Sequence, residues 1–156
     1  YIKIQNNWSY LMTRINIVNP SELTDQHLIA EYREITMVPG SLKRTLVSKV
    51  GYKESKVPER YTLNSGHVYF FYNKGKYLHR RYGELIREMR LRGFNPSVDR
   101  VFPYKIFMDN GLYNDWTPTI EDHIVIRERI EEKIAMKPEW YRRTQYEISI
   151  DKIICT

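Results

Sequence analysis

Residues 77–92, YLHRRYGELIREMRLR, carry the pattern that decides the fold of this chain. Apolar side chains recur there at the spacing of a single helix face, at Leu78, Tyr82, Leu85 and Met89. Charged side chains fill other positions of the stretch: Arg80, Arg81, Glu84, Arg87, Glu88 and Arg90. A stripe of this kind predicts a long amphipathic helix with a buried apolar face and solvated charges, and Gly93 marks its end.

A second helix is expected upstream. Asn19-Pro20-Ser21-Glu22 is typical of a helix start, because Asn can cap, Pro suits the first turn and Glu can return a hydrogen bond. Its buried positions are expected at Leu23, Leu28, Tyr32 and Ile35. Its other faces carry His27, Glu31 and Glu34. Pro39-Gly40 is expected to interrupt or kink this helix.

A third helix is expected toward the C-terminus. Thr119, with Asp122 three residues later, forms a capping pattern, and Lys137-Pro138 stops the helix. Its apolar side is assigned to Ile120, Ile124, Ile130 and Ile134. The short aromatic run 66–72 suits a buried strand by propensity, but no partner strand is evident nearby, so we expect a buried helix there.

Together these elements predict an all-α fold, a single compact domain of about three main helices with long connecting loops. Loops are expected at 48–58, which is basic and rich in turn residues, and at 95–116, which contains two prolines and Asn110-Gly111. The domain is expected to span residues 12–144. Residues 1–11 lack periodicity and are interpreted as a leader or upstream extension outside the active enzyme, and residues 145–156 as a C-terminal tail.

Charge favours a phosphate-bearing partner. Lys and Arg number 25 against 19 Asp and Glu, which gives a net charge of +6 and a pI near 9.3. Such an excess binds polyanions when the basic side chains share one surface, and 13 Tyr and 3 Trp suit base stacking. From charge alone, a basic protein without such a partner stays equally open.

Several site classes are absent from the sequence. The histidines at 27, 67, 79 and 123 lack zinc-motif spacing, and no glycine-rich phosphate loop occurs, so we expect no metal and no cofactor. No apolar run approaches the roughly 18 residues of a membrane span. The single Cys155 suggests a reducing intracellular setting.

Met12-Thr13-Arg14-Ile15-Asn16 resembles the beginning of a protein, although eleven residues precede it. Removal of a Met before a small Thr would leave Thr13 with a free α-amine. The pKa of an α-amine is about 7.7–8.0, against about 10.4 for Lys, so roughly a tenth is neutral at pH 7. A neutral amine is a nucleophile toward an electrophilic carbon. The pair Arg33-Glu34, taken alone, is an ordinary exposed charged pair of a helix, and so is 129–133.

Read together, these pieces resemble the pyrimidine-dimer DNA glycosylases with AP lyase activity of phages, where the enzyme is called endonuclease V, and of algal viruses. The segments that carry the resemblance are 12–16, 22–28, 30–34, 63–68 with 70–72, 92–94, 113–115 with 117–119, and 132–138 with Trp140-Tyr141. They occur in the order typical of the family and cover about 12–144, with the algal-virus branch most similar.

The resemblance implies a DNA repair enzyme with a single all-α domain that removes ultraviolet-induced cyclobutane pyrimidine dimers from duplex DNA. It implies that the α-amine of Thr13 attacks C1′, forms a Schiff base and nicks the strand by β-elimination, with Glu34 as the essential carboxylate. It implies phosphate contacts by Arg14, Gln26, Arg33, Arg129 and Lys133. It also implies a place for His27 in the active-site segment and lesion binding by Trp140 and Tyr141.

The resemblance further implies no cofactor, double-stranded DNA containing dimers or abasic sites as partner, a monomer, no membrane, and an intracellular location with viral or host DNA. Two departures exist: Met37 stands where the phage form has a basic residue, and Arg142-Arg143 makes the tail more basic and less aromatic. One alternative is a silent lesion-binding protein whose amine is blocked by residues 1–11. Another is a basic helical regulator that binds undamaged DNA equally well.

Overall fold

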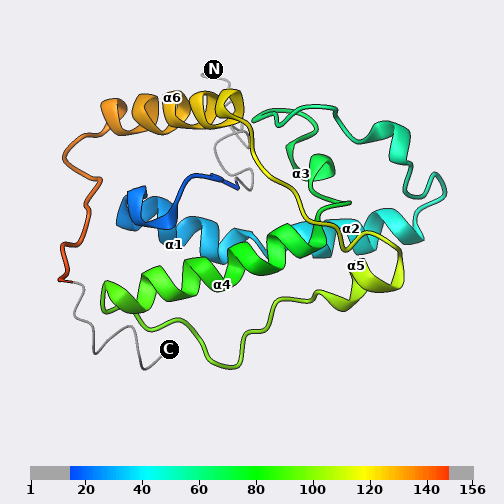
Figure 1. Cartoon of the computed structure of the whole chain (residues 1–156), viewed down its shortest axis with the longest axis horizontal. Helices are drawn as coiled ribbons and strands as arrows, with labels where there is room; N and C mark the ends of the chain where they lie inside the picture. The colour runs from blue at the N-terminus through cyan, green and yellow to red at the C-terminus, as the bar shows by residue number, and fades with distance from the viewer. Residues whose placement is uncertain (1–14, 148–156) are drawn as a thin grey trace, which may run out of the picture.

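Helices are the only regular secondary structure in residues 15–147, which are the residues that the computed structural model describes. In chain order they are the short 3-10 turn η2 (Pro20–Glu22), α1 (Asp25–Glu34), α2 (Met37–Val47), the 3-10 turn η3 (Glu54–Lys56), α3 (His67–Phe70), α4 (Gly75–Leu91), α5 (Lys105–Asp109) and α6 (Ile120–Met136). Figure 1 shows α1 running beside α4, with α6 on the opposite side of α1 from α4. The expected all-α fold is therefore confirmed.

Helix α4 is the amphipathic helix predicted at 77–92, and its apolar stripe is buried. Leu78 and Leu85 are fully buried, and Tyr82 and Met89 nearly so, against α1. The prediction that all its charges are solvated is wrong for Arg81 and Glu88, which are buried. Both positions follow an apolar residue of the stripe by three, so they point to the same side of the helix as the core.

The buried Glu88 belongs to a charged cluster that ties the end of α4 to the start of α1. Arg92 donates to Glu88 Oε1 and to Asp25 Oδ1, both at 2.9 Å. The hydroxyl of Tyr146 also donates to the Glu88 carboxylate, at 2.8 Å to Oε2. Each buried charge thus has an opposite charge or a hydrogen bond, as burial in a low dielectric requires.

The first long helix begins later and ends earlier than the sequence suggests. Asn19 caps only η2, by accepting from the Ser21 amide, while Thr24 caps α1 by accepting from the His27 amide. A new helix, α2, runs through Pro39-Gly40, so these residues do not form the interruption. The break lies at 35–36 instead. If α1 continued, the ring of Pro39 would clash with the carbonyl of Ile35, so a new helix begins and accommodates the proline in its first turn.

The connecting regions agree with the sequence except at one place. Residues 67–70 form the short helix α3, which confirms a helix over a strand in that run, and most residues of 48–58 are exposed. The region 95–116, expected to be irregular, contains α5. The fully buried Phe107 of α5 packs so closely against Gly75 that α5 is held by α4 rather than by its own five residues.

Helix α6 has the expected ends but a different buried face. Thr119 and Asp122 form a reciprocal capping box, and the helix ends at Met136, just before Lys137-Pro138. Ile126 is fully buried, whereas Ile120 and Ile124 are 77% and 49% exposed, so their assignment to the apolar side is wrong. Helix α6 contacts the hydrophobic core through a narrow face, since Ile126 and Ile130 are the α6 residues that pack on it. Among the described helices none has the length and apolar character needed to cross a membrane.

Candidate active site between α1 and α6

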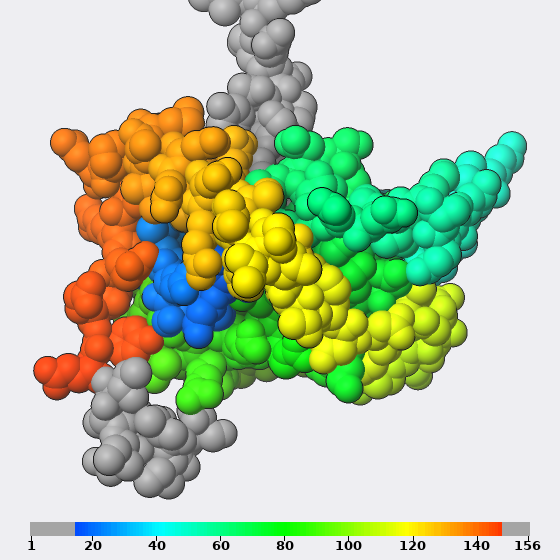
Figure 2. All heavy atoms as spheres, turned by 45° about the horizontal axis from the view of Figure 1, so that its top comes forward, coloured from blue at the N-terminus to red at the C-terminus, as the bar shows by residue number. Residues whose placement is uncertain are grey.

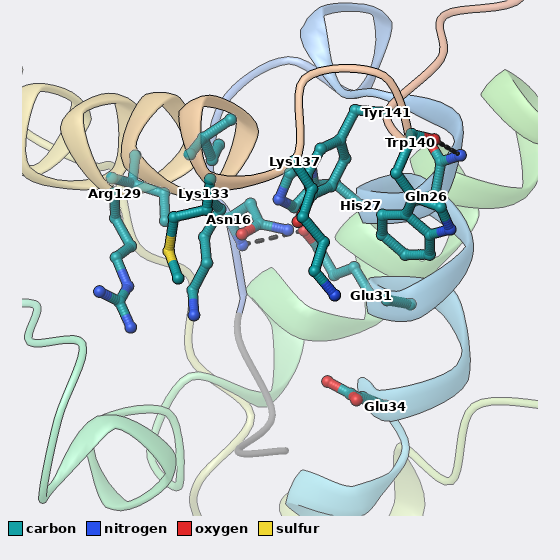
Figure 3. Close-up of a pocket in the computed structure, with 14 residues that line it drawn as sticks. Asn16, Gln26, His27, Glu31, Glu34, Arg129, Lys133, Lys137, Trp140 and Tyr141 are labelled. Atoms are coloured by element: carbon teal, nitrogen blue, oxygen red, sulfur yellow. Dashed lines mark hydrogen bonds between the residues drawn. The ribbon is translucent and has the colours of Figure 1, made fainter. Parts of the chain in front are cut away.

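A cleft of about 400 Å³ lies between α1, α6 and the segment that follows α6. Its walls are formed by Asn16, Gln26, His27, Ala30, Glu31, Glu34, Ile126, Arg129, Ile130, Lys133, Met136, Lys137, Trp140 and Tyr141. Figure 3 shows the α6 side chains descending toward the same space that the α1 side chains enter. Figure 2 shows the N-terminal part of the described chain, in blue, at the surface between α6, α4 and the C-terminal segment.

The cleft brings together seven of the ten residues that the sequence singles out: Gln26, His27, Glu34, Arg129, Lys133, Trp140 and Tyr141. Arg33 is exposed and does not line it, and its carbonyl accepts a hydrogen bond from Arg100 at 2.8 Å. Thr13 and Arg14 lie outside the described residues. The cleft therefore unites parts of the chain separated by about a hundred residues.

Glu34 ends α1 and projects toward the basic side of the cleft (Figure 3). Arg129, Lys133 and Lys137 face it from α6 and the following turn, at spacings of four residues that place them on one side. Arg129 also pairs with Glu132 at 3.4 Å. The Glu34 carboxylate facing several cations makes this cleft suited to an anionic ligand that develops positive charge at one point.

His27 is held as a neutral ring on the α1 side. Its Nδ1 lies 2.6 Å from the Thr24 hydroxyl, and its ring stacks on Tyr141 with centroids 4.8 Å apart. The pKa of His27 is lowered to about 4, chiefly because the ring is buried; the nearby Glu31 opposes this shift and Lys133 adds to it. A ring that is neutral near pH 7 contacts a ligand by hydrogen bonding or stacking, not by ion pairing.

Residues 12–100 match the family model for pyrimidine dimer DNA glycosylase, which is more than half of the chain. The chain belongs to the pyrimidine dimer DNA glycosylase family. The matched range includes Glu34 and the other cleft residues of α1, whereas the cleft residues of α6 and Trp140-Tyr141 lie beyond residue 100. A glycosylase of this family acts on DNA, a polyanion, which agrees with the cationic side chains of Arg129, Lys133 and Lys137 along the cleft.

In this glycosylase Gln26 fastens the segment that follows α6 to α1. Its side-chain amide donates to the Trp140 carbonyl at 2.6 Å, and its oxygen accepts from the Arg142 amide at 2.9 Å. The Asp25 amide donates to the Arg142 carbonyl at 2.6 Å. Both ends of the Gln26 amide are thus used to place Trp140 and Tyr141 at the rim of the cleft.

Sequence reasoning missed Glu31, which lies at the floor of the glycosylase cleft. It is buried and pairs with Arg81 of α4 through two hydrogen bonds, of 2.6 and 3.0 Å. A signal existed: Glu31 lies three residues after Leu28 and four before Ile35, at core spacing, and Arg81 has the same relation to Leu78 and Leu85. Opposite charges at core positions of two packed helices indicate a buried pair. Asn16 and Lys137 gave no comparable signal.

The described residues of this glycosylase contain no group of three or more His, Cys, Asp or Glu arranged to hold a metal ion. The buried acids already have protein partners: Glu31 binds Arg81, and Glu88 binds Arg92. The cleft is instead lined by the carboxylates of Glu31 and Glu34, several cations and the rings of His27, Trp140 and Tyr141.

Proposed function

We propose that this member of the glycosylase family excises cyclobutane pyrimidine dimers from duplex DNA and then nicks the strand as an AP lyase, using the α-amine of Thr13. The glycosylase domain corresponds to residues 12–144, and removal of Met12 and of the residues before it makes Thr13 the first residue. The enzyme works as a monomer without a cofactor wherever the damaged DNA lies. The family supports the glycosylase part. The lyase part is supported by the chemistry that follows.

One observation carries the proposal: Asn16, three residues after Thr13, lines the same cleft as Glu34. Three residues span at most about 10 Å. The length of the chain alone therefore limits how far a Thr13 amine can be from Asn16, which supports its use at this cleft. With such an amine, the carboxylate and the basic wall of the cleft would complete the set of groups that this reaction needs.

In the proposed reaction the neutral amine attacks C1′ of the 5′ nucleotide of the dimer. The bond from C1′ to the base breaks, and the base leaves with the bonding electron pair. Positive charge develops on the sugar during this step, and the carboxylate of Glu34 stabilises it. The sugar ring then opens as its oxygen leaves C1′, which gives a Schiff base between Thr13 and the sugar.

The Schiff base withdraws electrons from C2′, so a proton can be removed there, with Glu34 as the base. The electron pair moves to break the bond between C3′ and its oxygen, and the 3′ phosphate leaves. Hydrolysis of the Schiff base returns the amine. No step needs an oxidant, a reductant or a metal ion.

The remaining walls of the cleft suit duplex DNA. Arg14, Arg33, Arg129 and Lys133 are proposed to bind phosphates around the lesion. Gln26 is proposed to contact the phosphate backbone, and His27 to serve as a neutral hydrogen-bonding group beside the sugar. Trp140 is 57% exposed and Tyr141 partly exposed, so both can stack on bases displaced when the duplex kinks.

The test compares Glu34→Gln with Glu59→Gln in proteins that begin at Thr13. Every core residue described lies at or after Ile15, so this form retains the described core. We expect Glu34→Gln to abolish strand cleavage of irradiated duplex and Glu59→Gln, an exposed loop residue, to leave it unchanged. Cleavage by Glu34→Gln at the unsubstituted rate would contradict the role of the carboxylate.

The main alternative is a protein that binds lesions without reacting, because residues 1–11 block the amine. It predicts salt-dependent binding to irradiated duplex and no turnover by the full 156-residue chain. The proposal predicts the same silence for the full chain but cleavage once Thr13 is the first residue. A protein that begins at Thr13 and binds lesions without cleaving them would favour the alternative.

A further inference from the structure

Four buried side chains hold the backbone of residues 15–18, and the proposed reaction uses none of them. The Ile15 amide donates to Nε2 of His67 at 2.9 Å, and the Tyr61 hydroxyl donates to the Ile15 carbonyl at 2.5 Å. The Asn16 amide donates to Glu31 Oε1 at 2.9 Å, and Arg81 donates to the Val18 carbonyl. Three helices and a loop therefore meet at the segment that leads to Thr13.

His67 can make its contacts in one form only. A backbone amide is solely a donor, so Nε2 must carry the lone pair that accepts from Ile15. Nδ1 lies 2.7 Å from the Thr62 carbonyl, which is solely an acceptor, so Nδ1 carries the hydrogen. The ring is 1% exposed and packs edge-on against Tyr61 and Phe71. It is thus a fixed, oriented acceptor for the Ile15 amide.

The held segment is also strained. Ile17 has φ of +48°, a conformation that a β-branched residue rarely adopts, and the Val18 amide donates back to the Asn16 carbonyl across it. Such a residue persists only where its surroundings determine it, and strain of this kind gathers at functional sites. The surroundings here are the hydrogen bonds at 15, 16 and 18 and the burial of Ile17, which is 5% exposed.

From these contacts we infer that His67 is a positioning residue for the Thr13 amine. The inference rests on the proposed function. Thr13 lies two residues before Ile15, so its amine is within about 7 Å of the Ile15 nitrogen that His67 holds. Fixing that nitrogen limits the positions open to an amine two residues away. His67 does not touch the reacting atoms; it acts through the backbone of Ile15.

An ordinary structural role for His67 predicts different behaviour. If the ring only fills the core, its replacement lowers stability and leaves the rate of the folded fraction unchanged. If it positions the amine, loss of the acceptor slows the covalent step in the folded protein, and a substitute acceptor restores the rate. Single-turnover kinetics on folded protein separate the two.

The experiment uses proteins that begin at Thr13 and carry His67→Leu, His67→Gln or, as a matched control, His79→Leu. His79 also hydrogen-bonds a side chain, Tyr113, and stacks on aromatic rings, but it has no described hydrogen bond to residues 15–18. The measurements are the single-turnover rate of borohydride trapping on duplex with an abasic site, the Kd for duplex with a tetrahydrofuran site, and Ile15 amide exchange by NMR.

We expect His67→Leu to trap about 100-fold more slowly, the scale that a misplacement near 1 Å produces. Its Kd should stay within a factor of two, and its Ile15 amide should exchange faster. His67→Gln, whose side-chain oxygen can accept from the amide, should recover most of the rate, and His79→Leu should trap normally. If His67→Leu does not fold, Tyr61→Phe removes a single hydroxyl from the same segment and should slow trapping without altering Kd.

Trapping by folded His67→Leu at the unsubstituted rate would overturn the positioning role, above all if Ile15 exchange has risen. An equal loss of rate in His67→Gln and His67→Leu would also overturn it. Absence of any adduct from the unsubstituted protein would instead refute the proposed function, and the positioning role with it. In that case the exchange measurement would still report whether His67 holds Ile15, so the two failures are distinguishable.

Discussion

Removing one partner of the buried Glu31–Arg81 pair should destabilise this protein at least as much as removing both partners together. The side chains are 0% and 2% exposed and share hydrogen bonds of 2.6 and 3.0 Å. Glu31→Gln leaves a buried guanidinium without its counter-charge, and Arg81→Met leaves a buried carboxylate. Each loss costs about 3–5 kcal/mol of unfolding free energy. For a chain of this length that corresponds to a fall in Tm of roughly 6–20 °C.

The double variant Glu31→Gln/Arg81→Met has no buried net charge, and the Gln oxygen can still accept from the Asn16 amide. Its loss should be no larger than that of either single variant. The coupling energy should therefore be at least as large as one single loss, about 3 kcal/mol. Urea unfolding followed by far-ultraviolet circular dichroism gives the four free energies. If the two losses add within about 0.5 kcal/mol, the pair is not the uncompensated buried unit described here.

Three further outcomes are expected. Because burial holds the pKa of His27 near 4 while the unfolded ring titrates near 6.5, the unfolded chain binds more protons between these values. The unfolding free energy should thus fall as pH drops from 6.5 to 4, and His27→Gln should flatten that fall in urea titrations. Gly75→Ala should lower the unfolding free energy by about 1–3 kcal/mol, because the added Cβ would lie 2.3 Å from Phe107 Cγ. Gly83→Ala, whose Cβ would have nothing within 4 Å, should raise the unfolding free energy by up to about 1 kcal/mol. Equal effects of the two substitutions would contradict this packing. Arg129→Ala and Lys133→Ala should each reduce the slope of log Kd against log salt concentration by about 0.9 for duplex DNA. The control Lys105→Ala, at an exposed position of α5, should leave the slope unchanged. Equal slopes for all three variants would show that α6 does not contact the DNA.

Local sequence patterns were sufficient to predict α4 and both ends of α6. The stripe Leu78, Tyr82, Leu85 predicted α4, and the Thr119 capping box predicted the start of α6. Both signals are local, since they depend on residues within one or two turns. Propensity failed where a tertiary contact decides, as at α5, whose Phe107 is held against Gly75.

The candidate site divides in the same way. Seven expected residues meet in one cleft, because the resemblance to the family supplied them and the packing of α6 beside α1 brings them together. Glu31 was assigned to a helix face other than the buried one, and His67 received no individual role within the run 66–72. The burial of Glu31 and the orientation of the His67 ring depend on partners about fifty residues away, Arg81 and Ile15. A pattern within one helix or loop carries no information about such partners.

The central claim is that the Thr13 amine forms the covalent bond to DNA. The direct measurement is borohydride reduction of the protein that begins at Thr13 on duplex containing an abasic site, followed by proteolysis and mass spectrometry of the DNA-linked peptide. We expect the link to lie on the α-nitrogen of Thr13. A link on a lysine of the cleft, such as Lys133 or Lys137, or no adduct at all, would contradict it.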